Sequence, residues 1–396
     1  MPSVDLTTLP GWSSLSDGAH NITIVAKAGG YRDSEPSAAV SVEKVTPAVY
    51  TDCITFTGET SDFTLKARYK EWDGTVEYST DHNTWTIWNG TSVSSVDKKL
   101  YLRGSGNTKF YTSEGAQLSL SARAACSGNI QTLLEYSNPP TSISAAYCYH
   151  DMFYNCTNLT AAPVLPATTL ATYCYYNMFN NCTNLTTAPA LPATTLTDKC
   201  YISMFKNCTN LTTAPALPAT TLTAYCYNAM FYGCTNLTTA PALPATTLAT
   251  TCYSNMFNNC TSLTQAHALP ATTLTTDCYF QMFYECTSLT QAPALPATTL
   301  APSCYAAMFR GCTSLTQAPA LPATILEAEC YSNMFRDCTN LKISSTQSSK
   351  YPTAWRIPSS GTISSTSTDW NGYMLNDTGG TFTSNPSINT TYYGAW

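Results

Sequence analysis

The sequence predicts an α/β solenoid, a curved array of eight 26-residue units preceded by small all-β, sandwich-like modules. Sixteen of the eighteen cysteines fall into two series that advance by 26 residues without an insertion. They belong to eight copies of C-Y-x-x-M-F-x-x-C-T-[NS]-L, joined by seven copies of L-P-A-T-[TI]-L. A strictly phased period between 20 and 50 residues is typical of solenoids, whose repeats stack on one another.

Each unit is predicted to contain a short strand, a proline turn and a short helix. Cys226, Met230 and Cys234 are spaced i, i+4 and i+8, which would place them on one apolar side of a helix. Pro241 and Pro244 have no N–H and limit the strand to about four residues. Stacked strands lie about 4.8 Å apart, whereas helices are about 10 Å across. We therefore expect the array to curve, with its helices on the outside.

Changes in sequence pattern divide the chain into five segments. Alternating residues in 1–46 predict part of an immunoglobulin-like or fibronectin-like β module, with its missing strands upstream in a longer product. Hairpin-like segments in 47–125 predict a second small β domain. Residues 126–147 are the predicted N-terminal cap, and 148–341 are the eight repeats. The last segment, 342–396, is interpreted as an insertion followed by a C-terminal cap, because an uncapped coil would expose an apolar face.

The repeats also resemble a known family. Residues Met230 to Leu237 form an aromatic segment that ends in Gly-Cys, then Thr-Asn-Leu, with a proline four residues further on. This pattern resembles the BspA-like leucine-rich repeat proteins of bacterial surfaces. The tail segments 379–382 and 389–393 look like those of relatives from gut bacteria and their phages. The resemblance covers roughly residues 126–396, but the period is 26 instead of nearer 23 and each unit has two cysteines. It implies a leucine-rich-repeat array, surface display and adhesion, and names no ligand.

Composition argues against several partners. Charged residues make up 11% of the chain, the net charge is -6 and there is no basic run, so nucleic acid is not an expected partner. No apolar stretch approaches the roughly 18 residues that span a bilayer, so no membrane insertion is expected. Residues Met1 to Trp12 lack the pattern of a signal peptide. Export would therefore use another route, or the chain would be cut from a longer product.

The paired cysteines have three interpretations. A C-x7-C spacing without histidine is unusual for zinc. Residues i and i+8 of a helix lie about 12 Å apart, beyond the roughly 7 Å limit for a disulfide. Columns of buried thiols are thus favoured, while disulfides stay open if the helix breaks or neighbouring coils pair.

No active site is predicted. His20, His82, His150 and His267 are scattered, and His267 replaces a repeat proline. The sequence therefore predicts neither an enzyme, nor a cofactor, nor a metal site.

Three tryptophans in the second β segment raise the question of a sugar platform. Trp72, Trp85 and Trp88 lie close in sequence and could present aromatic faces to a carbohydrate. The favoured interpretation is that two of them are core residues and one is exposed.

The units differ most at outward positions of the predicted helices. These positions are rich in Tyr and Asn, which suit adaptable contacts, although solvent-facing residues can also vary without any function. The predicted strand face carries short, nearly uniform Thr, Gln and Ala side chains, which offer few anchors. The ligand-binding candidates are therefore Tyr154, Tyr176, Tyr232, Phe280, Tyr284, Arg310 and Arg336.

The predicted function is non-enzymatic adhesion or recognition outside the cell. The expected partner is a cell-surface protein or glycan, bound through the leucine-rich-repeat solenoid. A bacterial surface adhesin is the first interpretation, and a phage tail-fibre or virion receptor-binding protein is the alternative. A carbohydrate-binding module of a larger enzyme is a remote third. Homo-oligomerisation through the β modules is compatible with each of them.

Overall fold

The chain forms two compact units, Met1–Tyr50 and Thr51–Trp396, in a computed structural model. The structure describes residues 18–22, 40–44, 52–110, 115–356, 360–361, 373–380 and 390–396. In the first unit, β1 (Gly18–Ile22) pairs antiparallel with β2 (Val40–Lys44). The other strands predicted for the immunoglobulin-like module lie outside the described residues.

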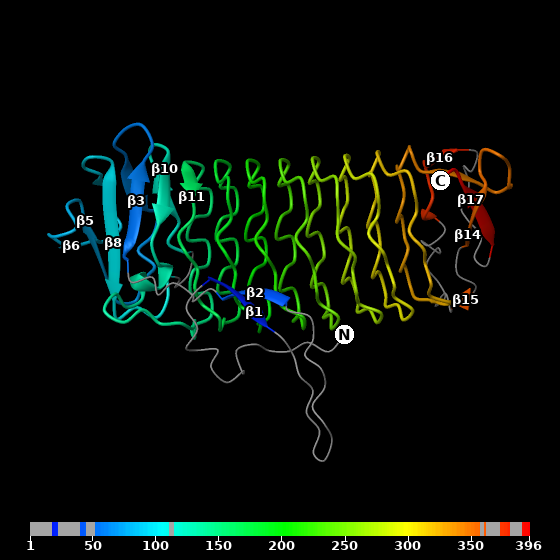
Figure 1. Ribbon diagram of the computed structural model, residues 1–396. Helices are drawn as coiled ribbons and strands as arrows, with labels where there is room; N and C mark the ends of the chain where they lie inside the picture. The colour runs from blue at the N-terminus through cyan, green and yellow to red at the C-terminus, as the bar shows by residue number, and fades with distance from the viewer. Residues whose placement is uncertain are drawn as a thin grey trace, which may run out of the picture. The chain divides into compact units, whose positions relative to one another are not determined.

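The second unit begins with a six-stranded sheet that runs into the solenoid (Figure 1). Its strands, in spatial order, are β11 (Leu159–Ala161), β10 (Ala124–Ser127), β3 (Ile54–Gly58), β8 (Lys99–Ser105), β5 (Thr75–Ser79) and β6 (Thr86–Ile87). A three-stranded sheet adds β7 (Val93–Ser94), β4 (Thr64–Ala67) and β9 (Leu118–Leu120). Strand β11 belongs to the first repeat, and the ring of Phe56 on β3 lies 6.4 Å from that of Phe153 in the first repeat. These strands therefore cover the apolar face of the first coil.

The segment between the two cysteines of each unit is a ribbon of turns, so the predicted helix is wrong. Residues 148–341 are all described and contain no helix; the 3-10 helix Ile130–Leu133 precedes them. In the second repeat, Tyr173, Asn177 and Asn181 have left-handed φ values of 59°, 52° and 63°. The N–H groups alternate between a turn bond, such as Met178 to the Tyr175 carbonyl at 3.2 Å, and a bond to the next coil, such as Tyr175 to the Cys200 carbonyl at 3.0 Å.

The predicted curvature loses its physical basis with the helix. Because the turn ribbons are hydrogen-bonded from coil to coil, the equivalent rings of Phe205 and Phe231 lie only 5.6 Å apart, well below the roughly 10 Å between packed helices. In Figure 1 the coils run side by side as nearly parallel traces. The prediction that helices splay one side of the array is therefore wrong.

The opposite side of the array has very little strand. Neighbouring coils meet there at single parallel bridges, such as Thr187 with Thr213 and Thr213 with Thr239. Two prolines, such as Pro189 and Pro192, lie between the two bridges of a coil and interrupt the ladder, because each lacks a backbone donor. Near the last repeat the pairing is longer than a single bridge. There, strand β12 (Ile325–Leu326) pairs in parallel with β15 (Ser360–Gly361).

A four-stranded sheet follows the eighth repeat. Its order is β14 (Thr353–Arg356), β17 (Thr391–Gly394), β13 (Lys342–Ser344) and β16 (Gly379–Gly380). The Phe335 N–H donates to the Met374 carbonyl at 2.9 Å, which continues the turn ladder by one further coil. Trp355 lies edge-on to Phe335, with ring centroids 6.1 Å apart, and its indole N–H donates to the Pro319 carbonyl at 3.0 Å. The last repeat is thus covered by apolar side chains.

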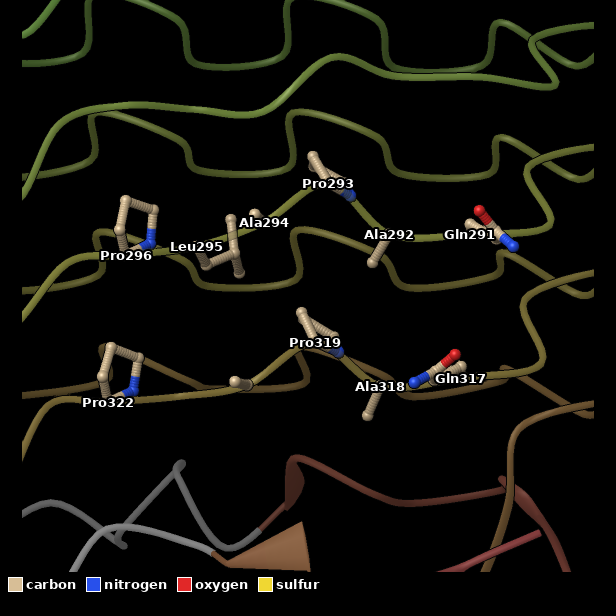
Figure 2. Close-up of a pocket in the computed structure, with 11 residues that line it drawn as sticks. Gln291, Ala292, Pro293, Ala294, Leu295, Pro296, Gln317, Ala318, Pro319 and Pro322 are labelled. Atoms are coloured by element: carbon tan, nitrogen blue, oxygen red, sulfur yellow. The ribbon is translucent and has the colours of Figure 1, made fainter. Parts of the chain in front are cut away.

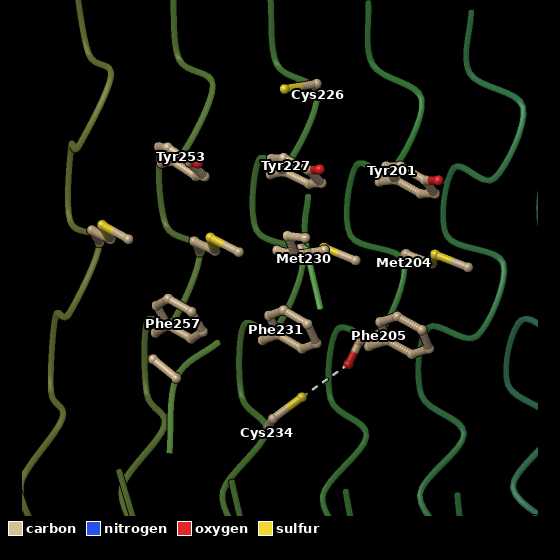
Figure 3. Packing of buried hydrophobic residues seen from close by; sticks show 14 of the residues in the cluster. Tyr201, Met204, Phe205, Cys226, Tyr227, Met230, Phe231, Cys234, Tyr253 and Phe257 are labelled. Carbon is tan, nitrogen blue, oxygen red and sulfur yellow. Dashed lines mark hydrogen bonds between the residues drawn. The ribbon is translucent and has the colours of Figure 1, made fainter. Parts of the chain in front are cut away.

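The core consists of columns in which each residue stacks on its equivalent in the next coil (Figure 3). The ring centroids of Phe205 and Phe231 are 5.6 Å apart with planes 5° apart. Those of Tyr201 and Tyr227 are 5.8 Å apart with planes 3° apart. All of these side chains are almost fully buried, so each coil stabilises its two neighbours.

The cysteines form two further columns of buried free thiols, which was the favoured prediction. In the second series each thiol from Cys182 onward donates to a phenylalanine carbonyl of the preceding coil. The Cys234 Sγ, for example, lies 3.1 Å from the Phe205 oxygen (Figure 3). Burial raises the pKa of Cys234 and Cys252 to about 12, so these thiols are protonated at neutral pH.

Two adjacent alanines test the turn ribbon against a helix. Ala307 has φ 51° and Ala306 lies outside the left-handed region, although both are less than a tenth exposed. Ala307→Gly is expected to stabilise the protein by roughly 1 kcal/mol because it relieves a left-handed conformation. Ala306→Gly should destabilise it by roughly 1 kcal/mol. Urea midpoints measure both changes, and a loss of stability in both variants would favour a helix.

Candidate binding surface

All seven predicted binding residues project from the turn ribbons and are partly buried. We call the surface formed by the outward side chains of residues 147–155 and their equivalents in later repeats the turn face. Tyr284, Arg310 and Arg336 occupy the same position in three consecutive coils, so the structure brings them together. Tyr154 and Tyr176 lie on the first two coils. Tyr232 lies between the two groups, with the Lys206 ammonium 4.7 Å from its ring centre, and Phe280 shares a column with Tyr176.

Aromatic rings gather at the N-terminal end of the turn face. Tyr147 stacks on Tyr173 with ring centroids 4.5 Å apart, and His150 stacks on Tyr176 at 4.7 Å. The Lys199 ammonium donates to the Tyr173 hydroxyl at 2.7 Å. Burial lowers the pKa of His150 to about 4, so this ring is neutral at pH 7. Tyr147 and Tyr173 were not among the binding residues predicted from the sequence. Each directly precedes the first cysteine of its unit, and a comparison of the units at that position could have found them.

Charged side chains gather at the C-terminal end. The Arg310 Nε lies 3.2 Å from the Asp337 carboxylate, and the guanidinium carbon lies 5.6 Å from the centre of the Tyr284 ring. The Arg336 Nε is 3.7 Å from Asp337 and 3.8 Å from Asp377. A depression of about 280 Å³ opens beside this group, lined in part by Tyr284, Arg310 and Asp337.

The proline side of the array carries a second kind of hollow (Figure 2). One of about 430 Å³ lies between residues 291–296 and 317–322. Alanines, prolines and a leucine line it together with Gln291 and Gln317, and no charged residue takes part. A similar hollow lies between the second and third repeats, around Pro192 and Pro215. The repeat generates these hollows by copying, and they offer few directional groups for specific recognition.

The three tryptophans do not form a common platform. Trp72 and Trp88 are 4% and 2% exposed and stack with centroids 5.2 Å apart, so they belong to the core. Trp85 is partly buried, and the Arg103 guanidinium lies 4.1 Å from its ring centre. Only Trp85 of the three could contact a ligand.

One cysteine–histidine pair came to light only in the structure. The Cys53 sulfur lies 3.4 Å from the His82 Nε2. Burial, the largest effect, raises the pKa of Cys53 to about 11, so the thiolate that a nucleophile requires is scarce at neutral pH. The described residues contain no group of three or more His, Cys, Asp or Glu that could hold a metal ion. None of the described helices is long and apolar enough to cross a membrane.

Comparison with known proteins identifies the family. The family model described as BspA type leucine-rich repeat region (6 copies) matches residues 133–264 and 203–342, which together span more than half of the chain. No curated protein and no solved structure matches the chain. The chain belongs to the BspA-type leucine-rich repeat family.

Proposed function

We propose that this protein is a non-enzymatic recognition protein that binds a cell-surface ligand through the turn face. Repeats of this family are typically non-enzymatic and surface-exposed. The observation that carries the proposal is the distribution of side chains among the repeats. The buried columns and the Thr, Ala and Pro side are nearly invariant, whereas the turn face gathers aromatic rings at one end and charges at the other. Aromatic and arginine clusters are the usual anchors of a binding site.

The geometry supports contact through several coils at once. Tyr154 and Tyr284 lie in equivalent positions five coils apart, so the candidate residues extend over much of the turn face. A ligand that engages one coil makes a small contact, so affinity would come from several coils and from display in many copies. This arrangement fits an adhesin on a bacterial surface.

Two sets of substitutions test which side of the array binds. Serine replaces Tyr154, Tyr176, Tyr232 and Tyr284 in one variant, and lysine replaces the exposed Thr186, Thr212, Thr238 and Thr264 in the other. We expect the serine set to weaken binding to intact cells at least tenfold, because anchor residues each contribute about 1 kcal/mol or more. The lysine set should stay within about threefold of wild type.

Binding is measured with labelled full-length protein on a panel of epithelial and bacterial cells. Thermal unfolding of both variants serves as the control for folding, because the tyrosines are partly buried. If the lysine set abolishes binding while the serine set retains it, the ligand sits on the proline and threonine side.

A further inference from the structure

The residue that precedes the second cysteine of each repeat has a left-handed backbone in all eight coils. Six coils carry a side chain at this position and two carry glycine. The eight residues are Asn155, Asn181, Asn207, Gly233, Asn259, Glu285, Gly311 and Asp337. Each side chain projects from the turn face, so a glycine here removes one outward side chain from an otherwise continuous column.

The two glycines differ in what surrounds them. A Cβ on Gly233 would lie 2.3 Å from the Asn207 Oδ1, so the neighbouring amide already fills that space. A Cβ on Gly311 would meet its nearest atom, the Glu285 Cγ, at 3.0 Å. The depression of about 280 Å³ lies at Gly311, between the side chains of Glu285 and Asp337. The depression thus lies at the glycine that its neighbour's side chain crowds less closely.

The walls of this depression combine an aromatic ring with paired polar groups. Tyr284, Glu285, Arg310 and Asp337 line it. Asn259, Thr261, Thr287 and Thr313 complete the lining. The Arg310 Nε lies 3.2 Å from the Asp337 carboxylate, so a donor and an acceptor lie next to one another.

Such a lining suits vicinal hydroxyls. Each hydroxyl both donates and accepts, so it can bond a carboxylate and a guanidinium or amide together, while an aromatic ring covers an apolar C–H face. The volume lies just below the roughly 300 Å³ at which sites for drug-sized ligands begin, which favours one ring over an extended chain. Two acidic residues line the depression, and its arginine is already paired with one of them, so an anionic ligand is disfavoured.

We propose that the depression at Gly311, between Glu285 and Asp337, binds one neutral pyranose residue of a glycan. This inference rests on the proposed function and assigns a ligand class to the turn face. The glycan residue would place its hydroxyls against the Arg310–Asp337 pair and the Glu285 carboxylate.

Matched asparagine substitutions test the site. Asn occupies this position in four of the eight repeats and tolerates a left-handed backbone, so Gly311→Asn fills the depression without breaking the ribbon. Gly233→Asn adds the same side chain at the equivalent position three coils away. Full-length protein is applied to an array of glycans that end in neutral, sialylated or sulfated sugars, with free monosaccharides as competitors.

We expect wild type to bind glycans with neutral ends, Gly311→Asn to bind at least tenfold more weakly, and Gly233→Asn to stay within about twofold. Glu285→Gln, which keeps the shape of the site, should also weaken binding. Unchanged glycan binding by Gly311→Asn, a preference for sialylated ends, or no binding of neutral glycans by wild type would each overturn the inference. If wild type still binds cells and the tyrosine-to-serine set does not, the proposed function survives that result.

Discussion

Raising the pH from about 8 to about 11 is expected to unfold the solenoid over a narrow range. Burial raises the pKa of five thiols from 9.0 to about 12, namely Cys156, Cys234, Cys252, Cys278 and Cys330. At pH 10 these thiols keep their protons in the folded protein, whereas the exposed thiols of the unfolded chain lose them. The unfolded state then binds fewer protons, so the free energy of unfolding falls as the pH rises.

The expected loss of stability is large because the contributions of the thiols to the free energy of unfolding add up. Their stabilising contribution is complete below about pH 9 and is lost as the pH rises from about 9 to about 12. Each thiol changes the free energy of unfolding by about 1.4 kcal/mol per pH unit within this window, so five thiols in one cooperative unit change it by about 7 kcal/mol per pH unit. A typical domain is stable by only about 5–15 kcal/mol. About two pH units should therefore suffice for unfolding.

Urea titrations at a series of pH values measure the slope, which counts the protons released on unfolding. Cys234→Ala should lower that count by about one. Denatured, non-reduced protein should also expose eighteen thiols to a thiol reagent. A urea midpoint that stays flat through pH 10 would contradict the thiol columns and indicate disulfides.

The period of the sequence was sufficient to predict the core. Tyr227, Met230, Phe231 and both cysteines of the unit recur at fixed positions, and all of them are buried. Burial follows from repetition, because a residue that stacks on its own copy in each neighbouring coil is shielded on two sides. The repeat register could therefore be read without knowing the local backbone conformation.

The backbone of the turn ribbon could not be read from the same spacing. Cys226, Met230 and Cys234 are four residues apart, which fits a helix of 3.6 residues per turn and equally a series of four-residue turns. The distinguishing signal was the residue before the second cysteine, which is Asn, Asp or Gly in seven of the eight repeats. These residue types favour a left-handed conformation, which a helix interior excludes. The prediction that helices splay one side of the array was wrong for the same reason.

The candidate site was predicted only in part because it depends on neighbours in three dimensions. Arg310 and Tyr284 were recognised as variable outward residues, but the depression beside them is set by Gly311 and by Glu285 and Asp337 in the adjacent coils. A comparison of the units position by position shows which side chains vary, but it does not show where the surface is hollowed. Depth arises where a missing side chain faces two longer ones across the coil spacing.

Phe231→Ala is expected to cost about 3–5 kcal/mol and to divide the stack into two parts. The Phe231 ring is fully buried, with Phe205 at 5.6 Å and Phe257 at 5.7 Å, so the substitution leaves a cavity that neither neighbour can fill without leaving its own column. In a solenoid, stability is approximately a sum of repeat and interface terms, so the loss falls on two interfaces at once.

Two variants of the same coil serve as controls for this prediction. Phe231→Leu keeps most of the volume and should cost clearly less, while Tyr232→Ala alters the partly buried neighbour and should cost about 1 kcal/mol. Urea unfolding gives the size of each effect. Hydrogen exchange should show faster exchange in the coils next to residue 231, with the terminal caps still protected. A cost below about 1 kcal/mol for Phe231→Ala would mean that the aromatic columns contribute little, and that the coil-to-coil hydrogen bonds of the turn ribbon hold the array together.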